Sequence, residues 1–264
     1  MAAADAGLSL QGVRVLVTRP VAQAQSLAQR IEQAGGEVIR FPTLEITATR
    51  NVTALERVLA GIAYFDLAIF ISPNAVVHGL AHLKTHGGLP AHLTVAAIGR
   101  GTARALAEAG IVNPITPVDG SDSEALLARP ELHQVAGKRV VIFRGEGGRA
   151  LLGDTLRTRG AQVEYAECYR RARPGTDAAP LSARLRANGV DIVTVTSVES
   201  LRNLHAMLDV AARAYLHRLP LVVVGTRQAE ACQALGIQTR PWIAHDAGDD
   251  AIVAAIQAWR AWKN

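Results

Sequence analysis

Short apolar runs alternate along the chain with longer segments in which apolar residues recur every three or four positions. Val13–Thr18 is rich in β-branched residues, and Asp66–Ile71 is an almost unbroken apolar run. Such runs predict β-strands, the second of them buried on both faces of a sheet. Helical spacing extends from Pro20 to Ala34 and ends at two glycines, which predicts a helix. This alternation of β and α segments predicts parallel sheets with helices on both faces.

The chain also repeats itself at an offset of 125 or 126 residues. The matched segments are Gly12–Arg19 with Gly137–Arg144, Phe65–Val76 with Val190–Leu201, and Ala97–Ile111 with Val223–Ile237. Three matches in the same order, with almost no drift in offset, predict two copies of one α/β unit.

The composition is that of a folded protein with a substantial core. Of the 264 residues, 49% are hydrophobic and only 19% are charged, which excludes an intrinsically disordered chain. The formal net charge is +5 and the isoelectric point is about 9.7, so acidic partners are favoured. The basic residues are spread along the chain rather than gathered in one stripe. We therefore expect no nucleic-acid partner.

Neither a disulfide framework nor a membrane anchor is indicated. Cys168 and Cys232 are the only cysteines and lack the spacing of metal ligands, so we expect a reducing compartment. The opening sequence MAAADAGLSLQG has no basic segment and no long apolar run, unlike a signal peptide. No apolar stretch approaches the roughly 20 residues that span a bilayer. We expect a soluble, cytoplasmic protein without a membrane partner.

The loops that lead from predicted strands into predicted helices carry the candidate chemistry. In parallel sheets, ligands bind at the carboxyl ends of the strands, where helix N-termini offer unpaired N–H groups to anions. These loops are Thr18-Arg19-Pro20, Ser72-Pro73-Asn74, Gly99–Thr102, Arg144–Arg149, Thr196–Ser200 and Gly225–Gln228. They hold hydroxyl groups, glycines and arginines, but no carboxylate pair and no nucleophile with its base. The pattern indicates a site for an acidic ligand.

One of these loops is the glycine-rich RGEGGR. Backbone N–H groups at Gly145, Gly147 and Gly148 could approach an acidic ligand, while Arg144 and Arg149 would add charge-assisted hydrogen bonds. The alternative is a flexible turn with solvated arginines. The loop lacks the Walker A pattern, so binding of a nucleoside triphosphate is not favoured.

We expect neither a cofactor nor a metal. The turn that begins at Gly99 resembles a dinucleotide fingerprint but has Arg104 where the third glycine belongs. His78, His82 and His86 are spaced to share one helical face, but no further ligand is evident. A solvated helical face is the favoured interpretation of these histidines.

With these motifs in order, the chain resembles the uroporphyrinogen-III synthase family over nearly its full length. The segments that carry the resemblance are VLVTRP, ISPNAV, AIGRGTARAL, SEALL, RGEGGR, CYRR and VVVGTRQAEA. The resemblance implies two flavodoxin-like α/β domains with parallel sheets, joined by a two-stranded connection and with a cleft between them. It implies one discontinuous domain of residues 1–42 and 170–264 and a second of residues 43–169. The repeat alone would divide the chain near Gln134.

The resemblance also implies a reaction. Members of the family convert linear hydroxymethylbilane to uroporphyrinogen III, invert the last pyrrole ring and release water, without cofactor or metal. Loss of the terminal hydroxyl gives an electrophilic azafulvene. Attack on it through the substituted carbon of ring D gives a spiro intermediate, and fragmentation and reclosure then yield the inverted ring. A site of backbone donors and hydroxyls suits such chemistry, because positioning and preorganised dipoles carry it.

The resemblance assigns Tyr169 to the family's cleft tyrosine. It is the candidate catalytic residue and would assist departure of the hydroxyl, mainly as a hydrogen-bond donor because a phenol has a pKa near 10. The residues expected to bind the substrate are Thr18, Arg19, Ser72, Pro73, Asn74, Gly99, Thr102, Arg144, Gly145, Gly147, Gly148, Arg149, Thr196, Ser197, Ser200, Gly225, Thr226 and Arg227. The sequence departs from the family pattern at Ile71 and Val198, where threonine and proline are usual.

The alternative function is that of a non-enzymic, two-lobed binding protein or sensor that closes on an anionic small molecule. The absence of a helix-turn-helix pattern and of a secretion signal speaks against it. A nucleotide-dependent enzyme is a third reading, weakened by the missing phosphate-loop pattern. We expect a monomer that binds an acidic tetrapyrrole, with transient contact to the preceding enzyme of the pathway left open.

Overall fold

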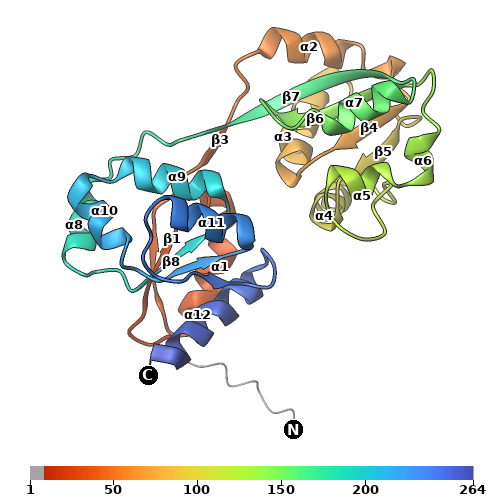
Figure 1. Ribbon diagram of the computed structural model, residues 1–264. Coiled ribbons are helices and arrows are strands. Elements are labelled where there is room, and N and C mark those ends of the chain that lie inside the picture. The colour runs from red at the N-terminus through yellow and green to blue at the C-terminus, as the bar shows by residue number, and fades with distance from the viewer. Residues whose placement is uncertain (1–8, 264) are drawn as a thin grey trace. The chain divides into compact units, whose positions relative to one another are not determined.

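The chain divides into two units, and the computed structural model describes residues 9–263 (Figure 1). The first unit comprises the chain up to Glu45 together with the chain from Ala172 onward, and the second comprises Ile46–Arg171. The boundaries expected after residues 42 and 169 differ from these by three residues and by two residues. The expectation that the chain has no signal peptide is based on its opening segment. The first eight residues of that segment lie outside the described residues.

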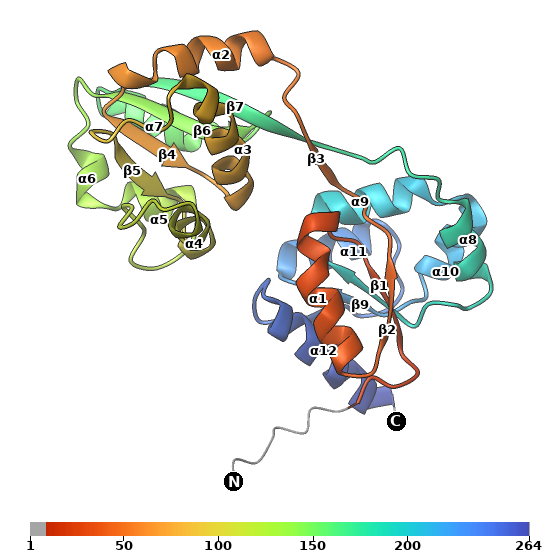
Figure 2. The same ribbon diagram turned by 180° about the vertical axis from the view of Figure 1, so that it is seen from behind.

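The first unit contains a five-stranded sheet in its described part, with the order β10-β9-β8-β1-β2. Its strands are β1 (Arg14–Val17), β2 (Glu37–Arg40), β8 (Ile192–Val195), β9 (Leu221–Val223) and β10 (Trp242–Ile243), and each pairs in parallel with its neighbours. One face is covered by α1 (Val21–Gln33) and α12 (Asp249–Lys263), which lie side by side in Figure 2. The other face is covered by α8 (Ala179–Arg186), α9 (Val198–Met207), α10 (Val210–Leu216) and α11 (Thr226–Ala234).

The described part of the second unit holds a five-stranded sheet of order β3-β7-β6-β4-β5. Its strands are β3 (Glu45–Thr47), β4 (Leu67–Phe70), β5 (Thr94–Ala97), β6 (Arg139–Gly145) and β7 (Gln162–Ala172). The helices of one face are α2 (Val52–Ala60), α3 (Pro73–Leu83) and α4 (Arg100–Glu108). Those of the other face are α5 (Ser123–Leu127), α6 (Pro130–His133) and α7 (Leu151–Thr158). Short 3-10 turns occupy Ile62–Tyr64 and Lys84–His86.

Strand β4 shows how the apolar pattern selects this layered arrangement. Ala68 and Phe70 point into the core beneath α3, whereas Leu67 and Ile69 point into the core beneath α5 and α7. All four are buried, as the unbroken apolar run predicts for a strand covered on both faces. The α/β class with parallel sheets is confirmed.

The internal repeat explains why the two sheets have the same strand order. By the repeat, β1 and β2 correspond to β6 and β7, and β4 and β5 correspond to β8 and β9. The order β9-β8-β1-β2 in the first unit therefore maps onto β5-β4-β6-β7 in the second. Each sheet combines the first two strands of one copy with later strands of the other, so a cut near Gln134 would divide both sheets.

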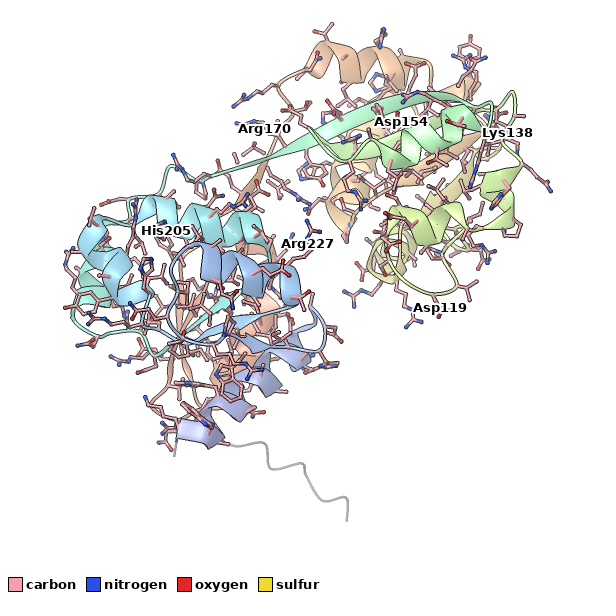
Figure 3. All side chains as sticks on the ribbon, in the orientation of Figure 1. Asp119, Lys138, Asp154, Arg170, His205 and Arg227 are labelled. Atoms are coloured by element: carbon pink, nitrogen blue, oxygen red, sulfur yellow. The ribbon has the colours of Figure 1, made fainter. Side chains whose placement is uncertain are left out.

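A pair of histidines lies between α9 and the end of α10 in the first unit. The Nε2 atoms of His205 and His217 are 3.1 Å apart, and the rings are stacked with centroids 5.3 Å apart. Figure 3 marks the position of His205. Burial lowers the pKa of His205 from its ordinary value of 6.5, and the nearby charges of Arg213 and His217 lower it further. His205 is therefore held neutral near neutral pH, in contact with His217.

We expect His205 to make the first unit sensitive to acid. Because the pKa of His205 is lower in the folded than in the unfolded chain, the unfolded chain binds more protons once the pH falls below about 6.5. The contribution of neutral His205 to the stability of the fold is complete above that pH and declines as the pH falls towards the folded-state pKa. Thermal unfolding at pH 7.5 and 5.5 should show a smaller acid-induced loss for His205→Gln than for the wild type. His245→Gln, at an exposed histidine paired with Asp246, serves as the control and should match the wild type.

Candidate functional site

In each unit, several of the predicted loops lie where the order of the strands in the sheet reverses. In the first unit the chain goes from β1 to β2 on one side and later to β8 on the other, so a topological switch point lies between β1 and β8. The corresponding switch point in the second unit lies between β4 and β6. Ligands of such sheets bind beyond the carboxyl ends of the strands at these points. Thr18, Thr196, Ser72 and Gly145 stand there, as the sequence predicts.

Serine hydroxyls cap the helices that begin at two of these loops. Ser72 Oγ accepts a hydrogen bond from the Ala75 amide at 3.0 Å, and Pro73 is the first residue of α3. Ser197 Oγ accepts one from the Ser200 amide at 3.0 Å and donates to Ser200 Oγ, also at 3.0 Å. Serine at the N-cap with proline directly after it is a favoured start of a helix. Asn74 follows Pro73 and is half-buried, and Thr196 is half-buried before α9.

The neighbouring helices α4 and α11 begin without a side-chain cap. Gly99 and Gly225 occupy their N-cap positions, and neither has a side chain that could accept from the first turn. Amide donors of these first turns therefore stay available to an anion. Thr102 is buried in α4, whereas Thr226 is exposed at the start of α11.

The capped and uncapped helix N-termini of each unit are adjacent. Gly101 lies beside Pro73, since a Cβ on this glycine would be 4.0 Å from the Pro73 Cγ. In the first unit, Gln228 Nε2 donates to the Thr196 carbonyl at 3.4 Å. Each unit thus presents two neighbouring helix N-termini, which we call the second-unit donor pair (α3 and α4) and the first-unit donor pair (α9 and α11).

An exposed arginine accompanies each donor pair. Arg227 on α11 is exposed and projects from the first unit in Figure 3, and Arg100 is exposed at the start of α4. No residue of the described chain forms an ion pair with either side chain. Arg100 was not among the residues predicted to bind substrate. The signal that could have found it is the repeat, because both arginines stand within two residues of the matched glycines Gly99 and Gly225.

Tyr169 lies beneath the second-unit donor pair rather than on an open surface. Its side chain is only 2% exposed, and its hydroxyl shares a hydrogen bond with Ser72 Oγ at 3.0 Å. The ring of His78 lies against it with centroids 5.6 Å apart. Burial lowers the pKa of His78, and the charge of His82 lowers it further, so this neighbour is neutral at neutral pH. From the sequence, Tyr169 is expected to face a ligand directly. Since the side chain is buried, we now expect it to act on a ligand through its hydrogen bond with Ser72.

Gly145 makes the position of Tyr169 possible. A Cβ on this residue would lie 2.7 Å from the Tyr169 Cε2 and 2.8 Å from its Cζ, closer than real contacts allow. The register of β6 with β7 shifts at this point, where Gly145 pairs with Tyr169. The glycine predicted to bring backbone donors to a ligand therefore makes room for a buried aromatic ring.

The remainder of the RGEGGR loop separates into a buried and an exposed part. Arg144 is only 4% exposed, with Nη1 donating to the Arg149 carbonyl at 3.4 Å and its guanidinium 4.6 Å from the centroid of Tyr165. Gly147, Gly148 and Arg149 are exposed, and Arg149 pairs with Glu124 at 2.8 Å. In this arrangement Arg144 stabilises the loop from inside, while the exposed residues remain accessible to a ligand.

Thr18 and Arg19 are engaged within the first unit. Thr18 is fully buried, and its hydroxyl donates to the Thr194 carbonyl at 2.8 Å. Arg19 forms an ion pair with Asp249 and donates to the Ala247 carbonyl at 2.6 Å. These contacts fix the β1 loop against the start of α12 and β8, so the two side chains position the switch point.

The described residues contain no group of three or more His, Cys, Asp or Glu side chains arranged to hold a metal. Of the three histidines predicted to share one helical face, His78 and His82 lie on α3, whereas His86 lies on the 3-10 turn that follows Leu83. His82 and His86 still face one carboxylate, because their ring nitrogens lie 3.9 and 2.9 Å from Glu56. Within the same part of the chain, no helix is long and apolar enough to cross a bilayer.

The two cysteines are unsuited to nucleophilic chemistry. Cys168 and Cys232 are both buried, and neither forms a disulfide. Burial raises the pKa of Cys168 to about 12 and that of Cys232 to about 11. Both therefore stay as neutral thiols in the cores of their units.

Comparison with known proteins identifies relatives that match most of the chain. The model of the HEM4 family, described as uroporphyrinogen-III synthase HemD, matches residues 25–254. The chain is 38% identical over 245 residues to the uroporphyrinogen-III synthase of Salmonella typhimurium, covering 92% of this chain and 99% of that protein. It is 36% identical over 248 residues to the Escherichia coli uroporphyrinogen-III synthase, with the same coverage.

Solved structures give the same picture of the fold. A mutant uroporphyrinogen III synthase from Thermus thermophilus matches with a TM-score of 0.63 at 21% identity, covering 96% of this chain and 100% of that chain. The uroporphyrinogen-III synthetase from Helicobacter pylori matches with a TM-score of 0.58 at 16% identity, covering 94% and 100%. At these identities the likeness establishes the α/β fold.

Proposed function

Because the chain belongs to the uroporphyrinogen-III synthase family, we propose that it converts linear hydroxymethylbilane to uroporphyrinogen III with inversion of ring D and loss of water. The observation that carries the proposal is the identity of 36–38% to synthases matched over 99% of their length. The loss of water makes the enzyme a hydro-lyase. We propose that it needs no cofactor, since elimination and ring closure require neither electron transfer nor an activated group.

The two donor pairs supply what an acidic substrate requires. Hydroxymethylbilane carries eight carboxylates, and each helix N-terminus offers amide donors and a partial positive charge to one of them. In this proposal the open first turns of α4 and α11 bind carboxylates, with Arg100 and Arg227 adding charge-assisted hydrogen bonds. The serine-capped turns of α3 and α9 present hydroxyls beside them.

The chemical step begins with departure of the terminal hydroxyl. Ser72 accepts from the Ala75 amide and shares a hydrogen bond with Tyr169, so its position is fixed from two sides. When the Tyr169 hydroxyl donates to Ser72 Oγ, the Ser72 hydroxyl can donate its own hydrogen bond to the leaving oxygen. Tyr169 then acts through Ser72 as a positioning residue and strengthens its donor. The azafulvene closes through the substituted carbon of ring D, and preorganised dipoles stabilise the developing charge.

We expect Tyr169→Phe to lower kcat about fivefold, the equivalent of one hydrogen bond, with little change in KM. The ring keeps its place over Gly145, so the variant should fold normally. Rates of isomer III formation and a thermal melt measure the two effects. Ser72→Ala should lower kcat at least as much, and adding Tyr169→Phe to it should cost nothing further. Tyr64→Phe, at a tyrosine 69% exposed in the same unit, is the control. If the Tyr169→Phe variant folds and its kcat is unchanged, Tyr169 does not act through Ser72.

The function is tested by giving freshly prepared hydroxymethylbilane to the purified protein, oxidising the product and separating the porphyrin isomers. The linear substrate closes unaided to the symmetric isomer, so the ratio of isomers reports the enzyme. We expect isomer III to dominate without added metal or cofactor. Isomer I alone, formed at the uncatalysed rate, would contradict the proposal and favour a binding protein for acidic tetrapyrroles. We further propose that the enzyme acts as a cytoplasmic monomer, which light scattering and cell fractionation test.

A further inference from the structure

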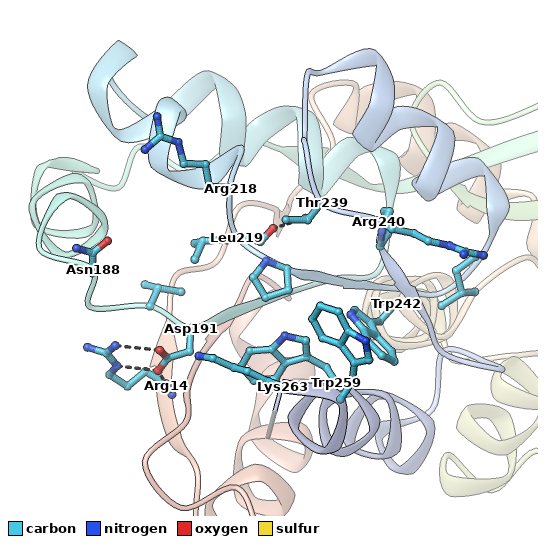
Figure 4. A pocket seen from close by; sticks show the side chains of 15 residues that line it. Arg14, Asn188, Asp191, Arg218, Leu219, Thr239, Arg240, Trp242, Trp259 and Lys263 are labelled. Carbon is cyan, nitrogen blue, oxygen red and sulfur yellow. Dashed lines mark hydrogen bonds and ion pairs between the residues drawn. The ribbon is translucent and has the colours of Figure 1, made fainter.

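The first unit has a cavity at the end of its sheet opposite the donor pair. The cavity has a volume of about 980 Å³, within the range of small-molecule sites (Figure 4). Arg14 stands at the start of β1, Asp191 just before β8, and Trp242 at the start of β10. The amino ends of the parallel strands therefore form its floor. Four-residue strands at about 3.3 Å per residue put roughly 13 Å between this cavity and the switch point.

All three tryptophans of the chain line this cavity. Trp259 is only 4% exposed and forms a fixed wall, whereas Trp262 is 76% exposed. The rings of Trp242 and Trp262 are tilted by 57° with centroids 6.2 Å apart. Indole faces of this kind stack on flat aromatic molecules.

The polar groups of the cavity are mostly cationic. Its lining holds four cationic side chains and one carboxylate, Asp191, which gives a net charge of +3 (4 − 1). Burial raises the pKa of Asp191, but hydrogen bonds from the side chain and amide of Arg14 lower it by more, so the carboxylate stays ionised. Two hydrogen bonds, of 2.8 and 3.0 Å, join it to the Arg14 guanidinium. The charge that remains belongs to Arg218, Arg240 and Lys263.

These cations stand around the aromatic walls. Lys263 Nζ lies 5.3 Å from the centroid of Trp259, and Arg218 and Arg240 are exposed at the rim. Within the described chain, no acidic side chain forms an ion pair with either arginine. The site would thus accept a molecule whose flat body lies between indoles and whose acidic groups reach the rim.

We infer that the first unit binds a flat aromatic polyanion in this cavity, at a site separate from the donor pairs and independent of the proposed reaction. A neutral aromatic molecule would leave Arg218 and Arg240 without an acidic partner. A small inorganic anion would leave the tryptophan walls without contact. Only a ligand with both properties uses the whole lining.

The tryptophans provide a specific test, because each indole N–H gives its own signal in a heteronuclear NMR spectrum and all three lie here. Naphthalene disulfonate, added to the full-length protein, should shift these signals saturably. Neutral naphthol and inorganic sulfate should each bind at least about tenfold more weakly. Equal affinity for naphthol would overturn the charge assignment, and the absence of saturable shifts would overturn the site.

Two variants separate the contributions of charge and stacking. Arg218→Glu with Arg240→Glu should weaken the disulfonate at least about tenfold and leave naphthol unchanged. Trp262→Ala should weaken both aromatic probes. All three positions are exposed, so folding should be preserved, and isomer III formation should match the wild type. Disulfonate binding that is unaffected by the double charge reversal would contradict the proposal.

Discussion

The double substitution Arg100→Glu, Arg227→Glu is expected to raise the KM for hydroxymethylbilane by about 100-fold, with kcat much less affected. Each arginine accompanies a helix N-terminus without a side-chain cap, and each is exposed without an ionic partner in the described chain. A glutamate at either position would replace an attraction to the acidic substrate by a repulsion. The initial rate of isomer III formation as a function of substrate concentration measures the effect.

The prediction separates binding from folding. An acidic side chain in the first turn of a helix interacts favourably with the helix dipole, so the variant should melt no lower than the wild type. Arg104→Glu with Arg202→Glu is the matched control, because it changes the net charge equally at exposed positions farther from the two N-termini. A control that raises KM as strongly as the double variant would assign the effect to overall charge. In that case the donor pairs would lose their proposed role.

The sequence predicts the elements of the fold better than their assembly. Apolar runs and glycine stops indicate strands and helices because these signals are local, as Asp66–Ile71 illustrates. Pairing is not local, since β1 joins β8, a strand 175 or more residues away in sequence. The repeat by itself favours a division near Gln134. The resemblance to a family supplies the exchange of strands between the two copies.

For the candidate site, backbone features were predictable and side-chain contacts were not. The cap at Ser72 follows from the Ser-Pro pair alone, since serine and proline are favoured at those positions. The burial of Tyr169 depends on Gly145, which lies on a neighbouring strand and has no side chain to occupy the space. Arg144 likewise packs against Tyr165, a contact that no local sequence pattern predicts. Such positions depend on which segments the fold brings together.

The second large effect is expected from Gly153→Ala, which should destabilise the second unit by about 3 kcal/mol. Tyr165 on β7 is held between the guanidinium groups of Arg144 and Arg157, 4.6 and 5.1 Å from its centroid. A Cβ on Gly153 in α7 would lie only 2.1 Å from the Tyr165 Oη and 2.8 Å from its Cζ. The ring cannot yield easily, because these cations enclose it. The gain of about 1 kcal/mol from alanine in a helix is too small to compensate.

The hydroxyl of Tyr165 itself offers a way to check the cause. It is buried, and no hydrogen-bond partner for it lies within the described residues. We therefore expect Tyr165→Phe alone to stabilise the protein by up to about 1 kcal/mol. In the double variant, the loss caused by Gly153→Ala should become smaller, since the Oη contact has gone while the Cζ contact remains. Comparing the four proteins gives the coupling energy directly.

The two units can be followed separately during urea unfolding. All three tryptophans belong to the first unit, so their fluorescence reports that unit, whereas circular dichroism reports both. Gly153→Ala should lower the midpoint by circular dichroism and leave that by fluorescence nearly unchanged. Gly101→Ala is the matched control, because its Cβ would meet only Pro73 Cγ, at 4.0 Å. Equal losses for both variants would mean that the cost arises from the helix backbone and not from the contact with Tyr165.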